Sequence, residues 1–205
     1  NFAMKNLHYS LLLLLLFSSA SMGQEAVEVD RVDFNSLRDD TTQVQIELTC
    51  QGNPSPEARD SRFVENIKVR VYLAWERDAR ERDARERPFD YYTSELEILI
   101  MEQLDKNNVY FYLPGLIVER DGLNTDPDFF YVEISIDGEE QKPQKSAMSS
   151  NIPNLDILNS FISRARAEGT ENKDILMPIY LLYNSGVDLG SVGALPTFLR
   201  RDVRD

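Results

Sequence analysis

The sequence predicts a mainly β protein, an immunoglobulin-like antiparallel β-sandwich with one inserted α-helix. Three observations indicate this fold. Several segments alternate apolar and polar residues with a period of two. Clusters of Gly, Pro, Asn and Asp separate these segments as turn signals. Only one stretch, about 154–168, carries apolar residues at helical spacing. Short strands divided by turns are typical of sandwiches and barrels, so we expect a single domain over 24–205.

The N-terminal segment predicts export from the cytoplasm. Lys5 precedes an apolar run that ends at Phe17, and small residues then lead to Gly23. This order is typical of a secretory signal peptide, so we expect residues 1–23 to be cleaved. The apolar run is shorter than the ~20 residues of a membrane span, so no span is expected after cleavage. Cleavage would also remove His8, the only histidine and the only imidazole base or ligand.

The charge balance limits the classes of partner. The 205 residues include 22 Lys and Arg against 35 Asp and Glu, for a net charge of −13. Such an acidic chain lacks the basic footprint that nucleic acids require, and it is poorly suited to anionic lipid surfaces. Cys50 is the only cysteine, so no internal disulfide is expected and stability must come from a packed core.

The first half of the chain predicts four strands. Segment 27–34 alternates irregularly, whereas 43–51 is the clearest strand, with Cys50 on its apolar face and therefore expected in the core. Segment 63–75 ends its apolar stripe at Trp75, which we also expect to be buried. Segment 89–102 should pair with 63–75 as a hairpin.

The loop of that hairpin contains a tandem duplication. Glu-Arg-Asp-Ala-Arg at 76–80 is repeated at 81–85, and acidic and basic residues recur four positions apart. No apolar stripe accompanies them. We interpret the duplication as a lengthened hairpin loop rather than a binding site.

The middle of the chain predicts further strands at 109–113 and 129–137, the second of which is closed by the turn signal Asp137-Gly138. Between them, Pro114-Gly115 turns the chain and residues 116–118 are expected to resume as a strand.

The last third predicts a linker, a helix, a strand and a tail. After the polar linker 139–153, the helix at about 154–168 starts at a capping Asn154, ends near Gly169 and should cover one end of the sandwich. Segment 175–184 is expected to be a late strand that Pro178 confines to an edge or a bulge. We expect the tail, 186–205, to wrap the domain.

The chain offers few residues for catalysis or metal binding. Without histidine no Ser-His triad or typical zinc site forms, and a Ser146 and Lys145 pair lies in a polar linker. We therefore expect no catalytic residue, no cofactor and no metal site. Looser calcium binding by the acidic turn between Asp121 and Asp128, which includes Asn124 and Asp126, is an open alternative.

Tyrosines supply the candidate interaction surface. The strand pattern places several of them opposite the apolar face, where aromatic rings can bind a sugar or a protein. Cover by the helix or the tail is the competing expectation. The candidate residues are Tyr91, Tyr92, Tyr110, Tyr112 and Tyr131.

Four stretches carry a resemblance to a known family. They are VQIELTCQGNPSPEARDSRFVENIKVRVYLAW (44–75), NNVYFYLPGLIVERD (107–121), KPQKSAMSSNIPN (142–154) and LPTFLRRDVR (195–204). Together they resemble exported pilus-like proteins encoded beside type IV pilus genes in mucin-degrading and related bacteria. The resemblance implies an immunoglobulin-like sandwich, no enzymatic activity and a role near pilus or envelope assembly. The chain lacks the long apolar helix of a type IV pilin after Gln24.

Three functions of different classes follow. The leading expectation is a non-enzymatic exported protein, periplasmic or at the cell surface, that contacts envelope or pilus-assembly proteins. The alternative is a carbohydrate-binding module that uses the exposed tyrosines. A carboxylate hydrolase is the third, and it would need two acidic side chains in a cleft.

Overall fold

The computed structural model describes residues 25–205 except 79, 81–86, 184, 198 and 201–205. The expected signal peptide, 1–23, and most of the duplicated loop therefore lie outside the described residues. Within the part of the chain that is described, no helix is both long and apolar enough to cross a membrane.

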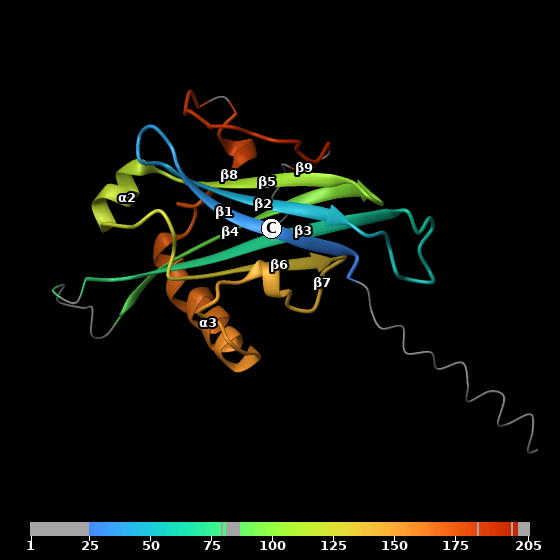
Figure 1. The fold of residues 1–205 in the computed structure, drawn as a ribbon, viewed down its shortest axis with the longest axis horizontal. Helices are drawn as coiled ribbons and strands as arrows, with labels where there is room; N and C mark the ends of the chain where they lie inside the picture. Colours follow the sequence, from blue (N-terminus) through green and yellow to red (C-terminus); the bar gives the residue numbers. More distant parts are fainter. Residues whose placement is uncertain (1–24, 79, 81–86, 184, 198, 201–205) are drawn as a thin grey trace, which may run out of the picture.

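Two antiparallel sheets pack face to face (Figure 1). The first sheet has the order β1-β2-β5-β8, and the second has the order β7-β6-β3-β4-β9. The strands of the first sheet are β1 Val27–Ser36, β2 Thr42–Cys50, β5 Lys106–Leu113 and β8 Met177–Pro178. Those of the second are β3 Phe63–Glu76, β4 Phe89–Glu102, β6 Phe129–Ile136, β7 Glu139–Glu140 and β9 Leu199–Arg200.

The connections give the sandwich its immunoglobulin-like character. The first two strands pair with each other, and the chain then crosses to the second sheet to form the β3–β4 hairpin. It returns to place β5 beside β2 and crosses again to place β6 beside β3. These crossings set the early strands of one sheet over the middle strands of the other, as in immunoglobulin domains. The fold class predicted from the sequence is confirmed.

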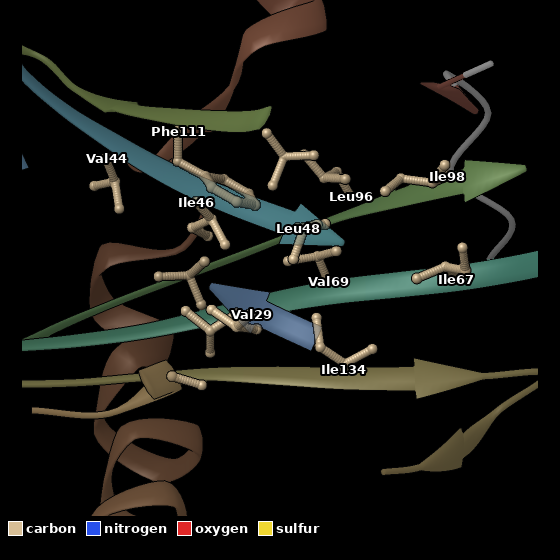
Figure 2. Close-up of a cluster of buried hydrophobic side chains, with 14 of the residues drawn as sticks. Val29, Val44, Ile46, Leu48, Ile67, Val69, Leu96, Ile98, Phe111 and Ile134 are labelled. Carbon is tan, nitrogen blue, oxygen red and sulfur yellow. The ribbon is translucent and has the colours of Figure 1, made fainter. Parts of the chain in front are cut away.

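The core lies between the sheets and follows the predicted alternation. Figure 2 shows side chains from both sheets pointing into the shared interior, among them Ile46 from β2, Val69 from β3 and Leu96 from β4. Cys50 is fully buried, and this burial raises the pKa of its thiol. Trp75 is also buried, and its Nε1 donates to the backbone oxygen of Asn124 at 2.8 Å. Both residues are core residues, as expected.

Helix α2 replaces an expected strand. Residues 116–118 were predicted as a strand because Ile and Val favour one, but Gly115–Asp121 is helical. Pro114 holds an extended backbone directly before the helix, and Gly122 ends the helix with φ +62°. A Cβ on Gly115 would lie 1.7 Å from the Asp39 carbonyl oxygen, so only glycine fits there. Tertiary contact and capping therefore override local propensity.

The late strand at 175–184 is much shorter than predicted. Only Met177–Pro178 pairs with β5, and the chain then turns into a 3₁₀ helix, η4, at Ile179–Leu181. Pro178 lies on a sheet edge, as predicted. Proline has no backbone N–H to donate to a further strand.

Helix α3 spans Leu155–Glu168 and begins where the cap signal indicates. The Asn154 side chain accepts a 3.0 Å hydrogen bond from the backbone N–H of Ile157. The helix covers the outer face of the second sheet rather than one end of the sandwich, and Phe161 and Ala165 pack against Tyr91 and Tyr131. The segment after η4 lies on the opposite side, over the first sheet (Figure 1).

Candidate interaction surface

The five tyrosines predicted as an exposed surface are buried. Their exposed fractions are between 0% and 4%. Four of them do point away from the interior between the sheets, as the strand pattern predicted, but other segments cover them. Tyr92 lies in the interior itself, where its ring packs edge-to-face against Trp75 at 5.6 Å. The expectation of exposure is wrong, and the competing expectation of cover by helix and tail describes the structure.

The C-terminal segment, residues 185–197 after η4, covers Tyr110 and Tyr112 on the first sheet. The Tyr112 hydroxyl donates to the backbone oxygen of Leu189 at 3.1 Å, and the Tyr110 hydroxyl accepts from the Gly193 N–H at 2.7 Å. Gln43 also donates to the Leu189 oxygen, at 2.7 Å. The segment is thus held by its backbone, and burial raises the pKa of the Tyr112 phenol. Neither ring can serve as a platform for a glycan while this segment is in place, because both side chains are buried.

Helix α3 covers Tyr91 and Tyr131 on the second sheet. Burial is the first cause of the raised pKa of both phenols. The Tyr131 ring stacks on Tyr72 with a centroid distance of 6.2 Å, and the Tyr91 ring tilts against Phe161 at 6.2 Å. Helix α3 packs directly on these rings.

An ion-pair network lies next to these rings. Glu133 on β6 is 3% exposed, and its two carboxylate oxygens accept from Arg70 at 2.9 Å and from Arg166 at 2.8 Å. The Tyr72 hydroxyl accepts from Arg166 at 2.9 Å and donates to Glu133 at 3.3 Å. Burial raises the pKa of Tyr72, although the two arginines offset part of this effect. Each buried polar group here has a partner within the protein.

A cavity of about 480 Å³ beside this network contains further charged groups. The residues that line it include Lys68, Arg70, Glu95, Glu97 and Tyr180. Arg70 binds Glu95 at 2.6 Å, and Lys68 binds the same carboxylate at 3.3 Å. Burial alone would raise the pKa of Glu95, but Arg70 and Lys68 outweigh it and lower that pKa. A two-carboxylate glycoside hydrolase needs one protonated carboxyl group and one free carboxylate, whereas Glu95 is paired with Arg70 and Lys68.

The acidic turn 121–128 is tied into the fold by hydrogen bonds. Asp121 accepts from Arg120 at 2.6 Å and from the Tyr92 hydroxyl, and its pKa is lowered, first by Arg120. Asp128 accepts from the backbone N–H of Glu76 at 2.8 Å. Among the described residues, no group of three or more His, Cys, Asp or Glu side chains is placed to hold a metal ion.

The linker residues considered for a Ser-Lys pair have a structural role. The Ser146 hydroxyl donates to the backbone oxygen of Val29, and Lys145 is exposed. Ser146 therefore joins the linker to strand β1.

A surface that the sequence did not indicate lies around α2. A cavity of about 250 Å³ opens between α2, the end of β5 and the residues after β8. Its apolar wall is formed by Tyr112, Pro114, Leu116, Met177, Leu182 and Val187. The polar residues at its rim include the acidic Asp39, Asp40 and Glu119. We call this set of nine residues the α2 surface.

Within the α2 surface, Leu116 and Val187 are exposed to solvent, whereas Tyr112 and Leu182 are buried. Leu116 is 79% exposed and Val187 is 36% exposed, and the neighbouring Leu181 is 60% exposed. Sequence reasoning missed this surface because four separate segments compose it. One local signal was present: Pro114-Gly115 and Gly122 bracket the interval in the positions that proline and glycine take at helix ends. A helix predicted between Pro114 and Gly122 would have placed Leu116 in its exposed first turn.

Comparison with protein-family models gives no match, and comparison with curated proteins gives none either. Among solved structures, the chain is similar to a crystal structure of a protein from Akkermansia muciniphila. The TM-score is 0.45 and the sequence identity is 14%, over 62% of this chain and 70% of that one.

Proposed function

We propose that this chain is a non-enzymatic exported protein that binds another protein of a pilus-like or envelope assembly through the α2 surface. The sandwich holds this surface on a stiff frame, and the partner supplies an apolar side chain to the cavity. The resemblance of the sequence to exported pilus-like proteins supplies the expected setting.

The exposed apolar side chains of Leu116 and Val187 in the α2 surface carry this proposal. A single exposed leucine is ordinary on a protein surface, but Leu116 lies in the same cavity lining as Val187, and contiguous apolar patches with a polar rim are typical of protein-binding sites. A rim that includes Asp39, Asp40 and Glu119 favours a partner with basic residues beside its apolar anchor. The same rim, on a chain of net charge −13, disfavours phosphate-rich partners.

The state of the other candidate groups supports binding rather than catalysis. Glu95 and Glu133 are both paired with Arg70, so neither is available as a free nucleophile or general base. The carbohydrate alternative needed an open tyrosine platform, and Tyr110 and Tyr112 lie beneath the C-terminal segment.

A capture experiment with two matched variants tests the proposal. Leu116→Asp places a charge in the α2 surface, whereas Leu104→Asp alters a leucine of similar exposure, 76%, in the turn after β4 at the other end of the sandwich. Immobilised wild-type protein should retain a pilus or secretion component from envelope extract of the bacterium that encodes it. Leu116→Asp should lose that component and Leu104→Asp should keep it. Recovery of no such component, or equal recovery with both variants, would overturn the proposal.

A further inference from the structure

The edges of the two sheets differ in length. Strands β7, β8 and β9 each have two residues and pair with only two residues of β6, β5 and β4 respectively, so none of these three outermost strands is itself long enough to accept an extended strand. Strand β1, Val27–Ser36, has ten residues and pairs only with β2 among the described strands. Long edge strands are templates for pairing with another chain unless something covers them.

Side chains from the linker cover the first half of the β1 edge. The Gln141 amide accepts from the Val27 N–H at 3.1 Å and donates to the Val27 oxygen at 2.8 Å. Gln144 accepts from the Val29 N–H at 2.7 Å and donates to the Val27 oxygen at 2.8 Å. Ser146 donates to the Val29 oxygen. These side chains take the place of a neighbouring strand over Val27 and Val29.

The second half of the β1 edge has no such cover. The register with β2 shifts between Val29 and Arg31, so that the backbone groups facing away from β2 are then those of Val32, Phe34 and Ser36. Within the described part of the chain, no hydrogen-bond partner is found for these groups. Three consecutive outward positions can accept an extended strand.

The side chains at this edge suit a second copy of the same strand. Phe34 is half-buried and packs edge-to-face on Phe130 at 5.2 Å, so its ring can extend the core to another ring beside it. On the opposite face, Arg31 pairs with Asp33 at 2.8 Å. The uncovered stretch 32–36 is symmetric about Phe34, as a two-fold contact between identical strands requires.

We propose that β1 pairs antiparallel with β1 of a second copy, centred on Phe34, and so joins the two first sheets into one continuous sheet. Val32 of each copy would lie opposite Ser36 of the other, and the two Phe34 residues would lie opposite each other. Each of these residues would donate and accept one backbone hydrogen bond.

The charge on Asp33 and the linker side chains that cover Val29 favour this register over its neighbours. Centring on Phe34 places Asp33 opposite Asn35, which can hydrogen-bond. Centring on Asp33 would place two carboxylates directly opposite each other, and like charges in that position are destabilising. Centring on Val32 would bring the second copy against Val29, whose backbone groups Gln144 and Ser146 already occupy.

This self-association uses backbone groups of β1, so it does not rest on the α2 surface or on the proposed function. Leu116→Asp should leave it unchanged. The two proposals can therefore fail separately.

Sedimentation of the purified protein at increasing concentration gives the first test. Wild-type protein should form a dimer. Ser36→Pro removes an outward N–H and leaves the bonds to β2 intact, so it should weaken the dimer by about tenfold or more. Ser36→Ala keeps the N–H at the same exposed position and should dimerise like wild type. A wild-type monomer at all concentrations, or a dimer that Ser36→Pro does not weaken, would overturn the proposal.

Disulfide cross-linking tests the register independently. The double variant Asp33→Cys with Asn35→Cys should form a covalent dimer on mild oxidation, because these positions face each other in the non-hydrogen-bonded pair, where side chains lie closest. The control Arg31→Cys with Asp33→Cys should remain monomeric on denaturing gels. The native Cys50 is buried and should contribute no background. Cross-linking of the control alone, or of both variants equally, would show that the register is wrong.

Discussion

Arg166 on helix α3 donates a 2.8 Å hydrogen bond to Glu133 on strand β6, and this contact ties the helix to the sheet that it covers. The carboxylate is buried and the guanidinium is half exposed. Arg70 holds the other carboxylate oxygen at 2.9 Å, so Glu133 sits between two cations from two different elements.

Replacing Glu133 by Ala should therefore destabilise the fold. Removing one partner of a buried ion pair costs ~3–5 kcal/mol, and the partial exposure of both arginines reduces this to about 2 kcal/mol in the free energy of unfolding. Urea denaturation measures the loss. Glu65→Ala, at an exposed site on β3, is the matched control and should change stability by less than ~0.5 kcal/mol. Equal effects at the two sites would contradict this account of the network.

The lowered pKa of Glu95 predicts an acid-dependent loss of stability. Although burial opposes ionisation, Arg70 and Lys68 hold the folded-state pKa below the usual 4.5. A group with a depressed folded pKa contributes stability above its unfolded pKa and loses it as the pH falls through the folded value. The contribution of Glu95 should thus be complete at neutral pH, begin to decline near pH 4.5 and disappear as the pH falls through the lower folded-state pKa.

Urea midpoints measured from neutral to acid pH test this prediction. Glu95→Gln should be less stable than wild type at neutral pH, and the two curves should converge in acid because the neutral side chain has no charge to lose. Curves that stay parallel through this range would show that Glu95 does not contribute.

The strand pattern predicted the sandwich because its alternation is local. In β2 the apolar face of Ile46 and Leu48 is readable from a few neighbouring residues, and the core follows from it. The same pattern correctly set Tyr110 and Tyr112 opposite that face. It could not show their cover, because the covering residues lie about eighty positions later and have no periodicity. The α2 surface escaped prediction for the same reason, since segments distant in sequence compose it.

The cover over the tyrosines predicts an unusual alkaline titration. Burial is the first cause of the raised pKa of six phenols, which belong to Tyr72, Tyr91, Tyr92, Tyr112, Tyr131 and Tyr180. Because the folded state favours their neutral form, they contribute stability that is complete below the unfolded value of 10.0 and is lost as the pH rises through the folded values.

Phenolate absorbance of native and urea-unfolded protein should therefore differ. In urea all the tyrosines should ionise together near pH 10, whereas the native protein should show a smaller rise there and a later one that coincides with unfolding. Superimposable curves would mean that the rings are open to water, as the first expectation from the sequence had it.

The approach of Gly193 to the first sheet predicts which residue holds the C-terminal segment in place. A Cβ at this position would lie 2.9 Å from the Asn108 amide nitrogen and 3.3 Å from the Tyr110 hydroxyl. Gly193→Val should push the segment away from these side chains and weaken the bond from its N–H to Tyr110. We expect the free energy of unfolding to fall by about 1–2 kcal/mol, which is in the range of ordinary destabilising substitutions.

Limited proteolysis measures the release, because a segment that leaves the sheet becomes a protease substrate. Cleavage within 185–197 should be faster in Gly193→Val than in wild type. Ser191→Val adds the same side chain at an exposed neighbouring position and should be cleaved at the wild-type rate. If both variants were cleaved alike, the added valine and not the close approach at Gly193 would explain the faster cleavage. The segment would then be held by other contacts, such as the hydrogen bonds that the Leu189 carbonyl accepts from Gln43 and Tyr112.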